Sequence, residues 1–160
     1  MNDIILTLIQ GLIFILYLTF IWVKFGILNS ISESWYKLRE LGGFWYMLFT
    51  VFCWSLGITM LFQTDKDMSF FIYSGAGLAF VGAATMFDLK GTVVPYVHFA
   101  GAAVGIVFAL LGLGFERNAW IPLIAFASAT LLIKLFKIKH SVWWIEIAAF
   151  LSAITGLLIY

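Results

Sequence analysis

Six long apolar runs, separated by short polar gaps, dominate the pattern of this chain. A helix needs about 20 mostly apolar residues to cross about 30 Å of hydrocarbon, and each run has close to that length. The runs are continuous rather than alternating, and they are too long for barrel strands, so the pattern predicts helices. The predicted spans are 4–23, 44–62, 68–87, 94–113, 119–136 and 141–160.

The composition agrees with a membrane protein, since 64% of the residues are hydrophobic and only 11% are charged. The spans and their connections occupy the whole chain, so we predict an all-α, polytopic transmembrane bundle of six helices as a single domain, 1–160. The leader of the first run contains the acidic Asp3, where a signal peptide is basic, so we predict a permanent span. The net charge of +1 gives no reason to expect a nucleic-acid partner, and the sequence contains no motif that predicts a cofactor. The expected partner is the lipid bilayer, and a bound lipid or a homo-oligomer is compatible with this pattern.

The basic residues are divided unevenly between the two sides that six alternating spans create. The side reached after the first span has seven of the nine, and the side of the N-terminus has Lys66 and Arg117. Cytoplasmic loops are enriched in Lys and Arg, so we predict an inner (cytoplasmic) membrane protein with both termini outside. The seven residues on the predicted cytoplasmic side are Lys24, Lys37, Arg39, Lys90, Lys134, Lys137 and Lys139.

The one long gap, 24–43, has the pattern of a short helix. Ser30 and Glu33 have the spacing of a capping box, and Gly42 and Gly43 are suited to end a helix. We also expect an ion pair between Glu33 and Lys37, four residues apart.

Apolar residues recur on one face of that segment, at Ile31, Trp35 and Leu38. This spacing predicts an amphipathic helix that lies on the cytoplasmic surface of the bilayer. Two interpretations remain open. The helix is an anchor that positions the first two spans, or it is the wall of a site. The residues of that second interpretation are Ser30, Ser32, Glu33 and Tyr36.

Three ionisable residues lie at or near membrane depth, where such groups are costly and often functional. Glu146 lies in the sixth span, and its helical face continues through a stripe of small residues that predicts an inward orientation. It is a proton carrier, a metal ligand or a general acid/base, or it makes a structural hydrogen bond to a backbone carbonyl or to Lys139. His98 opens the fourth span on a similar small-residue face, and Asp88 closes the third. Each has a structural alternative, as an interior hydrogen-bonding group for His98 and as a turn or ion-pair residue for Asp88.

Asp88, His98 and Glu146 belong to three spans and lie at similar depth in the predicted cytoplasmic half. If they converge, they form a polar pocket. The sequence itself assigns no metal, but a mixed carboxylate and imidazole set of this kind could hold zinc.

The segment Ser30–Tyr36, an Asp88-containing turn and the stretch Val97–Gly101 together resemble a pattern of uncharacterised bacterial six-span membrane proteins, whose layout is similar to that of the Frag/DRAM/Sfk group. The resemblance extends over most of the chain and implies the six-span architecture.

A more distant likeness is to the alkaline ceramidase and adiponectin-receptor superfamily, small helical bundles with Ser, Asp and His near one membrane face. Three histidines hold a catalytic zinc there, whereas this chain has only His98 and His140. We therefore predict a small transporter, a channel-like protein or a lipid-interacting protein with a polar pocket in the cytoplasmic half. The alternative is an intramembrane metal-dependent hydrolase of lipid amides or esters.

Overall fold

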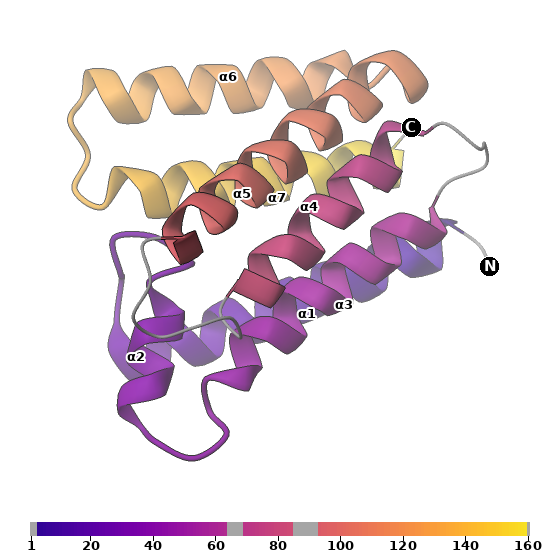
Figure 1. Cartoon of the computed structure of the whole chain (residues 1–160). Coiled ribbons are helices and arrows are strands. Elements are labelled where there is room, and N and C mark those ends of the chain that lie inside the picture. Colours follow the sequence, from indigo (N-terminus) through magenta and orange to yellow (C-terminus); the bar gives the residue numbers. More distant parts are fainter. Residues whose placement is uncertain (1–2, 64–68, 85–92, 160) are drawn as a thin grey trace.

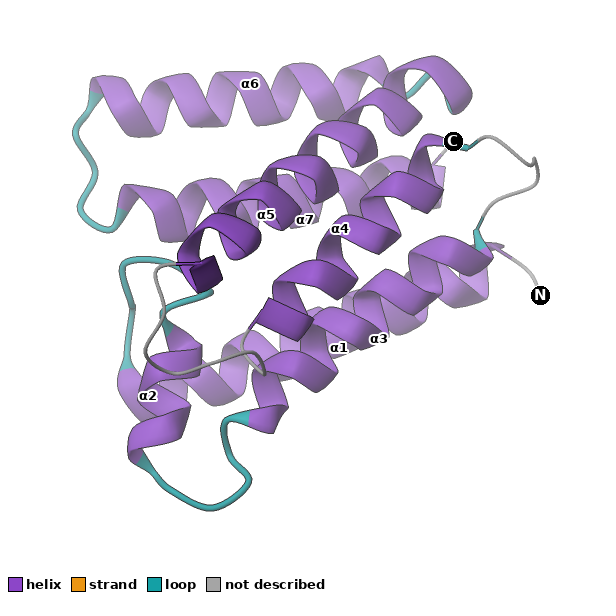
Figure 2. Ribbon diagram, in the orientation of Figure 1, coloured by secondary structure: helices purple, strands orange, loops and turns teal. Residues whose placement is uncertain are grey.

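The computed structural model describes residues 3–63, 69–84 and 93–159, with the side chains of 93–95 left undescribed. In these ranges the chain is helical and has no strand (Figure 2). The elements are α1 (Asp3–Phe25), α2 (Ser34–Glu40), α3 (Met47–Phe62), α4 (Phe70–Ala84), α5 (Val93–Leu111), the π-helix η1 (Gly112–Glu116), α6 (Trp120–Leu135) and α7 (Ser141–Ile159). The all-helical prediction is confirmed, and six helices coincide with the six apolar runs.

The long helices run alternately in opposite directions, so α1 begins and α7 ends at the same end of the bundle (Figure 1). Helix α4 packs between α3 and α5, while α1 packs on both α3 and α7. Helix α6 lies at the edge, where it packs mainly on α7. Short helix α2 lies at the end opposite to the start of α1, as Figure 1 shows.

Glycines bring the backbones of α4 and α5 into direct contact. A Cβ atom built on Gly77 would lie 2.7 Å from the carbonyl oxygen of Gly101 and 2.8 Å from the Cα of Gly105. Real Cβ atoms essentially never come so close to backbone, so a residue without a side chain is required here. This contact fixes α5 against α4 and therefore places the first turns of α5 at the α2 end of the bundle.

The apolar face of α2 packs on the bundle. Ile31, Trp35 and Leu38 are all buried, in one cluster with residues of α1, α3 and α7. The amphipathic face was predicted correctly, but this face contacts protein instead of the bilayer surface. The hydroxyl groups of Tyr17 in α1 and Ser34 in α2 are 2.6 Å apart, which adds a buried polar contact. Gly42 and Gly43 follow α2 with φ values of +75° and +58°, as expected of residues that end a helix.

The opposite end of the bundle has a set of polar residues that bond to one another, which we call the terminal network: Asp3, Thr7, Gln10, Gln63 and Arg117. Arg117 forms an ion pair of 2.8 Å with Asp3 and also donates to the backbone carbonyl of Gln63. The Gln63 amide donates to the Thr7 hydroxyl at 2.6 Å and accepts from the Gln10 amide at 3.1 Å. The network thus joins the start of α1 to the ends of α3 and η1.

Among the described residues, three helical segments are long and apolar enough to cross a membrane: Asp3–Phe25, Tyr96–Glu116 and Ser141–Ile159. The apolar helices Met47–Phe62, Phe70–Ala84 and Trp120–Leu135 are shorter. Large apolar side chains cover the outer surface of the bundle, including Leu12, Leu16 and Ile124, each more than half exposed. Such a surface suits contact with lipid rather than with water.

Candidate functional site

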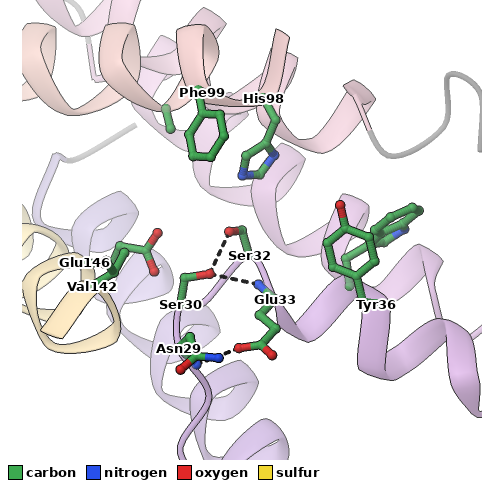
Figure 3. Close-up of a pocket in the computed structure, with 11 residues that line it drawn as sticks. Asn29, Ser30, Ser32, Glu33, Tyr36, His98, Phe99, Val142 and Glu146 are labelled. Carbon is green, nitrogen blue, oxygen red and sulfur yellow. Dashed lines mark hydrogen bonds between the residues drawn. The ribbon is translucent and has the colours of Figure 1, made fainter. Parts of the chain in front are cut away.

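A cavity of about 410 Å³ opens at the α2 end of the bundle. Three parts of the chain form its wall: the segment from the end of the first loop into α2, the start of α5 and the start of α7. Figure 3 shows His98 and Phe99 of α5 facing the segment that contains Ser30 and Ser32, with Glu146 of α7 beside them. The lining residues are Asn29, Ser30, Ser32, Glu33, Trp35, Tyr36, His98, Phe99, Ala102, Val142 and Glu146.

Glu146 is half-buried, and its carboxylate accepts a hydrogen bond from the backbone N–H of Ile31, with 2.5 Å between Oε2 and the nitrogen. A structural hydrogen bond, one of the alternatives for Glu146, is therefore present, but its partner is the Ile31 amide rather than a backbone carbonyl or Lys139. In the described part of the chain Oε1 has no hydrogen-bond partner. The predicted inward face is confirmed, since Ala149 and Ala153 behind Glu146 are buried.

The serines and Glu33 form a compact turn before α2. The Ser30 hydroxyl accepts from the Glu33 N–H at 3.1 Å and lies 3.0 Å from the Ser32 hydroxyl. Half of the predicted capping box is therefore present. The Glu33 carboxylate instead accepts from the N–H of Asn29 at 2.6 Å. The predicted pair of Glu33 with Lys37 is wrong as well, because Lys37 forms an ion pair of 3.1 Å with Glu40.

Asn29 fastens this turn to the start of α7. Its backbone carbonyl accepts from the N–H of Trp143 at 3.0 Å, and its side-chain oxygen lies 3.2 Å from Nδ1 of His140. Together with the bond between Ile31 and Glu146, these contacts attach a segment that follows α1 to the helix that ends the chain. Neither Asn29 nor its contacts could be identified from the sequence, because the pairing depends on how the loop folds back.

His98 lies one turn into α5 and is half-buried. Its ring is packed between aromatic neighbours, with its centroid 6.2 Å from that of Phe49 and 6.0 Å from that of Phe99. The small-residue face below it is buried, as predicted, since Gly101 and Gly105 pack on α4.

Two aromatic residues of α2 complete the wall. Tyr36 is 56% exposed and lies at the rim, whereas Trp35 is buried, and the two rings meet edge to face with centroids 4.6 Å apart. The indole N–H of Trp35 is buried and has no hydrogen-bond partner among the described residues. The Arg39 guanidinium lies over the Trp35 ring, 5.7 Å from its centroid, and is not part of the cavity wall.

The predicted site is thus brought together around one cavity, except for Asp88, which lies outside the described residues. The six predicted residues in its wall are Ser30, Ser32, Glu33, Tyr36, His98 and Glu146. Within the described ranges no three His, Cys, Asp or Glu residues are grouped as a metal site would need. The mixed set of Asp88, His98 and Glu146 therefore stays a prediction.

Sequence reasoning missed the apolar part of the wall. Val142 precedes Glu146 by one helical turn, and Ala102 follows His98 by one turn. Once His98 and Glu146 were chosen as site residues, this i, i+4 spacing could have identified both apolar residues.

Comparison of the chain with protein-family models, with curated proteins and with solved structures gives no match. The resemblances inferred from the sequence remain predictions, and the cavity has to be interpreted from its own chemistry.

Proposed function

We propose that this chain is a multi-pass membrane protein in which all six apolar helices cross the bilayer, and that its cavity binds the head of an amphipathic molecule. The protein would then act as a small transporter, a channel-like protein or a lipid-interacting protein. The observation that supports this most strongly is the mixed character of one cavity wall, in which hydroxyl, carboxylate and imidazole groups lie beside apolar side chains.

Six crossings are supported by the order of the helices. Each of the shorter helices connects two neighbours that run in the opposite direction, so a crossing by α1, α5 and α7 is most simply completed by crossings of α3, α4 and α6. A helix of 16 residues spans about 24 Å, and a bilayer can thin locally to accommodate the difference.

Membrane topology is tested by thiol labelling in a Cys53→Ala background. Cysteines introduced at positions 2 and 160 should react with an impermeant reagent from outside, and one at position 137 only after the cytoplasmic face is opened. The reverse pattern contradicts the proposed orientation.

Binding is tested by filling the cavity. Ala102→Trp places a large side chain in the wall, whereas Ala103→Trp places the same side chain on the exposed face of α5. Native mass spectrometry of protein purified in a neutral maltoside should find a bound amphiphile in the wild type and in Ala103→Trp, and none in Ala102→Trp. Equal occupancy in the two variants contradicts binding in this cavity.

The hydrolase alternative has its own test, since His98, Glu146 and two serines face the same cavity. Metal analysis of the purified protein distinguishes it. Stoichiometric zinc that disappears in His98→Ala would favour the hydrolase, and zinc retained in that variant would exclude His98 as a ligand.

A further inference from the structure

The charged groups in the cavity wall are acidic, although the surrounding loops are rich in Lys and Arg. Glu146 contributes a carboxylate that faces the cavity, Glu33 lines the wall with its carboxylate bonded to the Asn29 N–H, and the described lining residues include no Lys or Arg. Among the described lining residues, only His98 can become positively charged. A phosphate or sulfate group placed here would meet two carboxylates and lose its water, whereas a cation would be attracted by both.

The arrangement of Glu146 leaves room for such a cation. One carboxylate oxygen is occupied by the N–H of Ile31, and the other has no partner in the described part of the chain. Figure 3 shows the carboxylate turned toward the cavity, on the side of Ser32 and Phe99. Glu33 holds its position through the N–H of Asn29, so both acidic groups are fixed without a basic side chain.

Aromatic rings form the rest of the head-group region. Trp35, Tyr36 and Phe99 all line the cavity, and cations are attracted to the faces of such rings. Carboxylates together with aromatic rings are the combination that binds alkylammonium groups in water-poor sites.

The apolar side chains of the wall, among them Ala102 and Val142, give an apolar tail a surface to lie on beside the seam between α5 and α7. One helical turn below Ala102 and Glu146, a second cavity of about 30 Å³ is lined by Ile106, Ala149 and Phe150, among others. Its wall is almost entirely apolar, with Ser74 as its one polar side chain. That hydroxyl is already bonded to the carbonyl of Gly105 at 2.8 Å.

We propose that the cavity binds an amphipathic cation, an alkylammonium whose charged head lies between Glu146 and the aromatic rings, with Glu33 nearby, and whose tail lies along the apolar side chains of the cavity wall. This inference rests on the proposed function, because it names the class of molecule that the same cavity takes.

The test compares four radiolabelled probes with the same ten-carbon tail: decyltrimethylammonium, decylammonium, decanol and decyl sulfate. Binding to purified protein in maltoside is measured by scintillation proximity, and the part that Ala102→Trp abolishes is taken as binding in the cavity. The two ammonium probes should bind at least about tenfold more tightly than decanol, and decyl sulfate more weakly than decanol. A preference for the trimethyl head over the primary amine would show that the rings contribute more than the carboxylates.

Glu146→Gln keeps an acceptor for the Ile31 N–H and removes the charge, so it should lower affinity for the ammonium probes about tenfold and leave decanol unchanged. Glu33→Gln should act in the same direction. Glu40→Gln, on the same helix as Tyr36 but outside the cavity, is the matched control and should change nothing. An unchanged thermal unfolding midpoint shows that each variant is folded.

The outcomes separate the two proposals. Equal cavity binding of decanol and the ammonium probes, or tighter binding of decyl sulfate, overturns the preference for cations and leaves an amphiphile site in place. The absence of any binding that Ala102→Trp removes, for all four probes, overturns the proposed function itself.

Discussion

The two ends of the bundle use polar residues in opposite ways. In the terminal network, Asp3 pairs with Arg117 and the Gln63 amide bonds to Thr7 and Gln10, so nearly every polar group faces another polar group of the chain. The Oε1 atom of Gln10 is the exception. At the α2 end, polar groups surround open space, and one oxygen of Glu146 has no partner among the described residues.

This difference distinguishes two reasons for placing polar groups deep in an apolar bundle. Groups that satisfy one another hold helices together, because breaking one pair leaves a buried partner without a hydrogen bond. Groups that face a cavity contribute less to holding the helices, and they remain available to a molecule that enters. We therefore expect substitutions at the terminal network to change stability, and substitutions at the cavity to change binding.

The largest loss of stability is expected at the contact between α4 and α5. Both ends of the bundle depend on this contact. Gly77→Ala would place a methyl group against the backbone of Gly101 and Gly105 and should lower the free energy of unfolding by about 3 kcal/mol. Gly11→Ala is the matched control, since the nearest atom to its Cβ is Cγ2 of Ile154 at an ordinary 3.7 Å. Thermal unfolding in maltoside should separate the two variants, and equal midpoints would show that α4 and α5 are not packed as described.

A smaller loss is expected when the terminal network is broken. Arg117→Met removes the partner of Asp3, whose side chain is 30% exposed, and should cost about 2 kcal/mol of stability without changing amphiphile binding. Lys37→Met breaks an ion pair whose side chains are 37% and 65% exposed, and it should change stability by less than about 0.5 kcal/mol. A loss of ligand binding in folded Arg117→Met would mean that the two ends are coupled. It would contradict the expectation that the terminal network affects stability alone.

At the cavity, the expected loss of stability is smaller than at the terminal network. Glu146→Leu removes the acceptor for the Ile31 N–H and should cost about 1 kcal/mol, while Glu146→Gln keeps an acceptor and should cost less. Hydrogen exchange of a peptide covering residues 28–33 should accelerate in Glu146→Leu and stay near the wild-type rate in Glu146→Gln. Unchanged exchange in both would show that this bond does not hold the segment on α7.

Much of the helical framework could be predicted from the sequence, because a continuous apolar run of this length has few alternatives to a helix. The end of the bundle at which Glu146 and His98 lie could also be predicted. Both residues are near the start of their spans, and the alternating direction of the spans determines the end at which each one starts. The inward orientation of each side chain could be predicted from small residues at helical spacing, such as Ala149 and Ala153 behind Glu146.

Other features depend on the packing of helices distant in sequence, which periodicity does not encode. Gln63 was not recognised, because its partners Thr7 and Gln10 lie on a different helix and a neutral amide gives no charge signal. The amphipathic face of α2 was recognised, but its burial was assigned to the bilayer surface, because a bilayer and a bundle bury the same residues. Glu33 pairs with a backbone amide instead of Lys37 because the turn at Asn29 brings that amide closer.

The claim that the cavity at the α2 end admits cations is tested most directly by the reactivity of a thiol placed in its wall. In a Cys53→Ala background, Ser32→Cys would be treated with two methanethiosulfonate reagents of similar size, one ending in trimethylammonium and the other in sulfonate. The trimethylammonium reagent should react at least about tenfold faster, relative to the rates of both reagents with a free thiol, and Glu146→Gln should remove most of that preference. Equal relative rates, or faster reaction of the sulfonate reagent, would contradict the account.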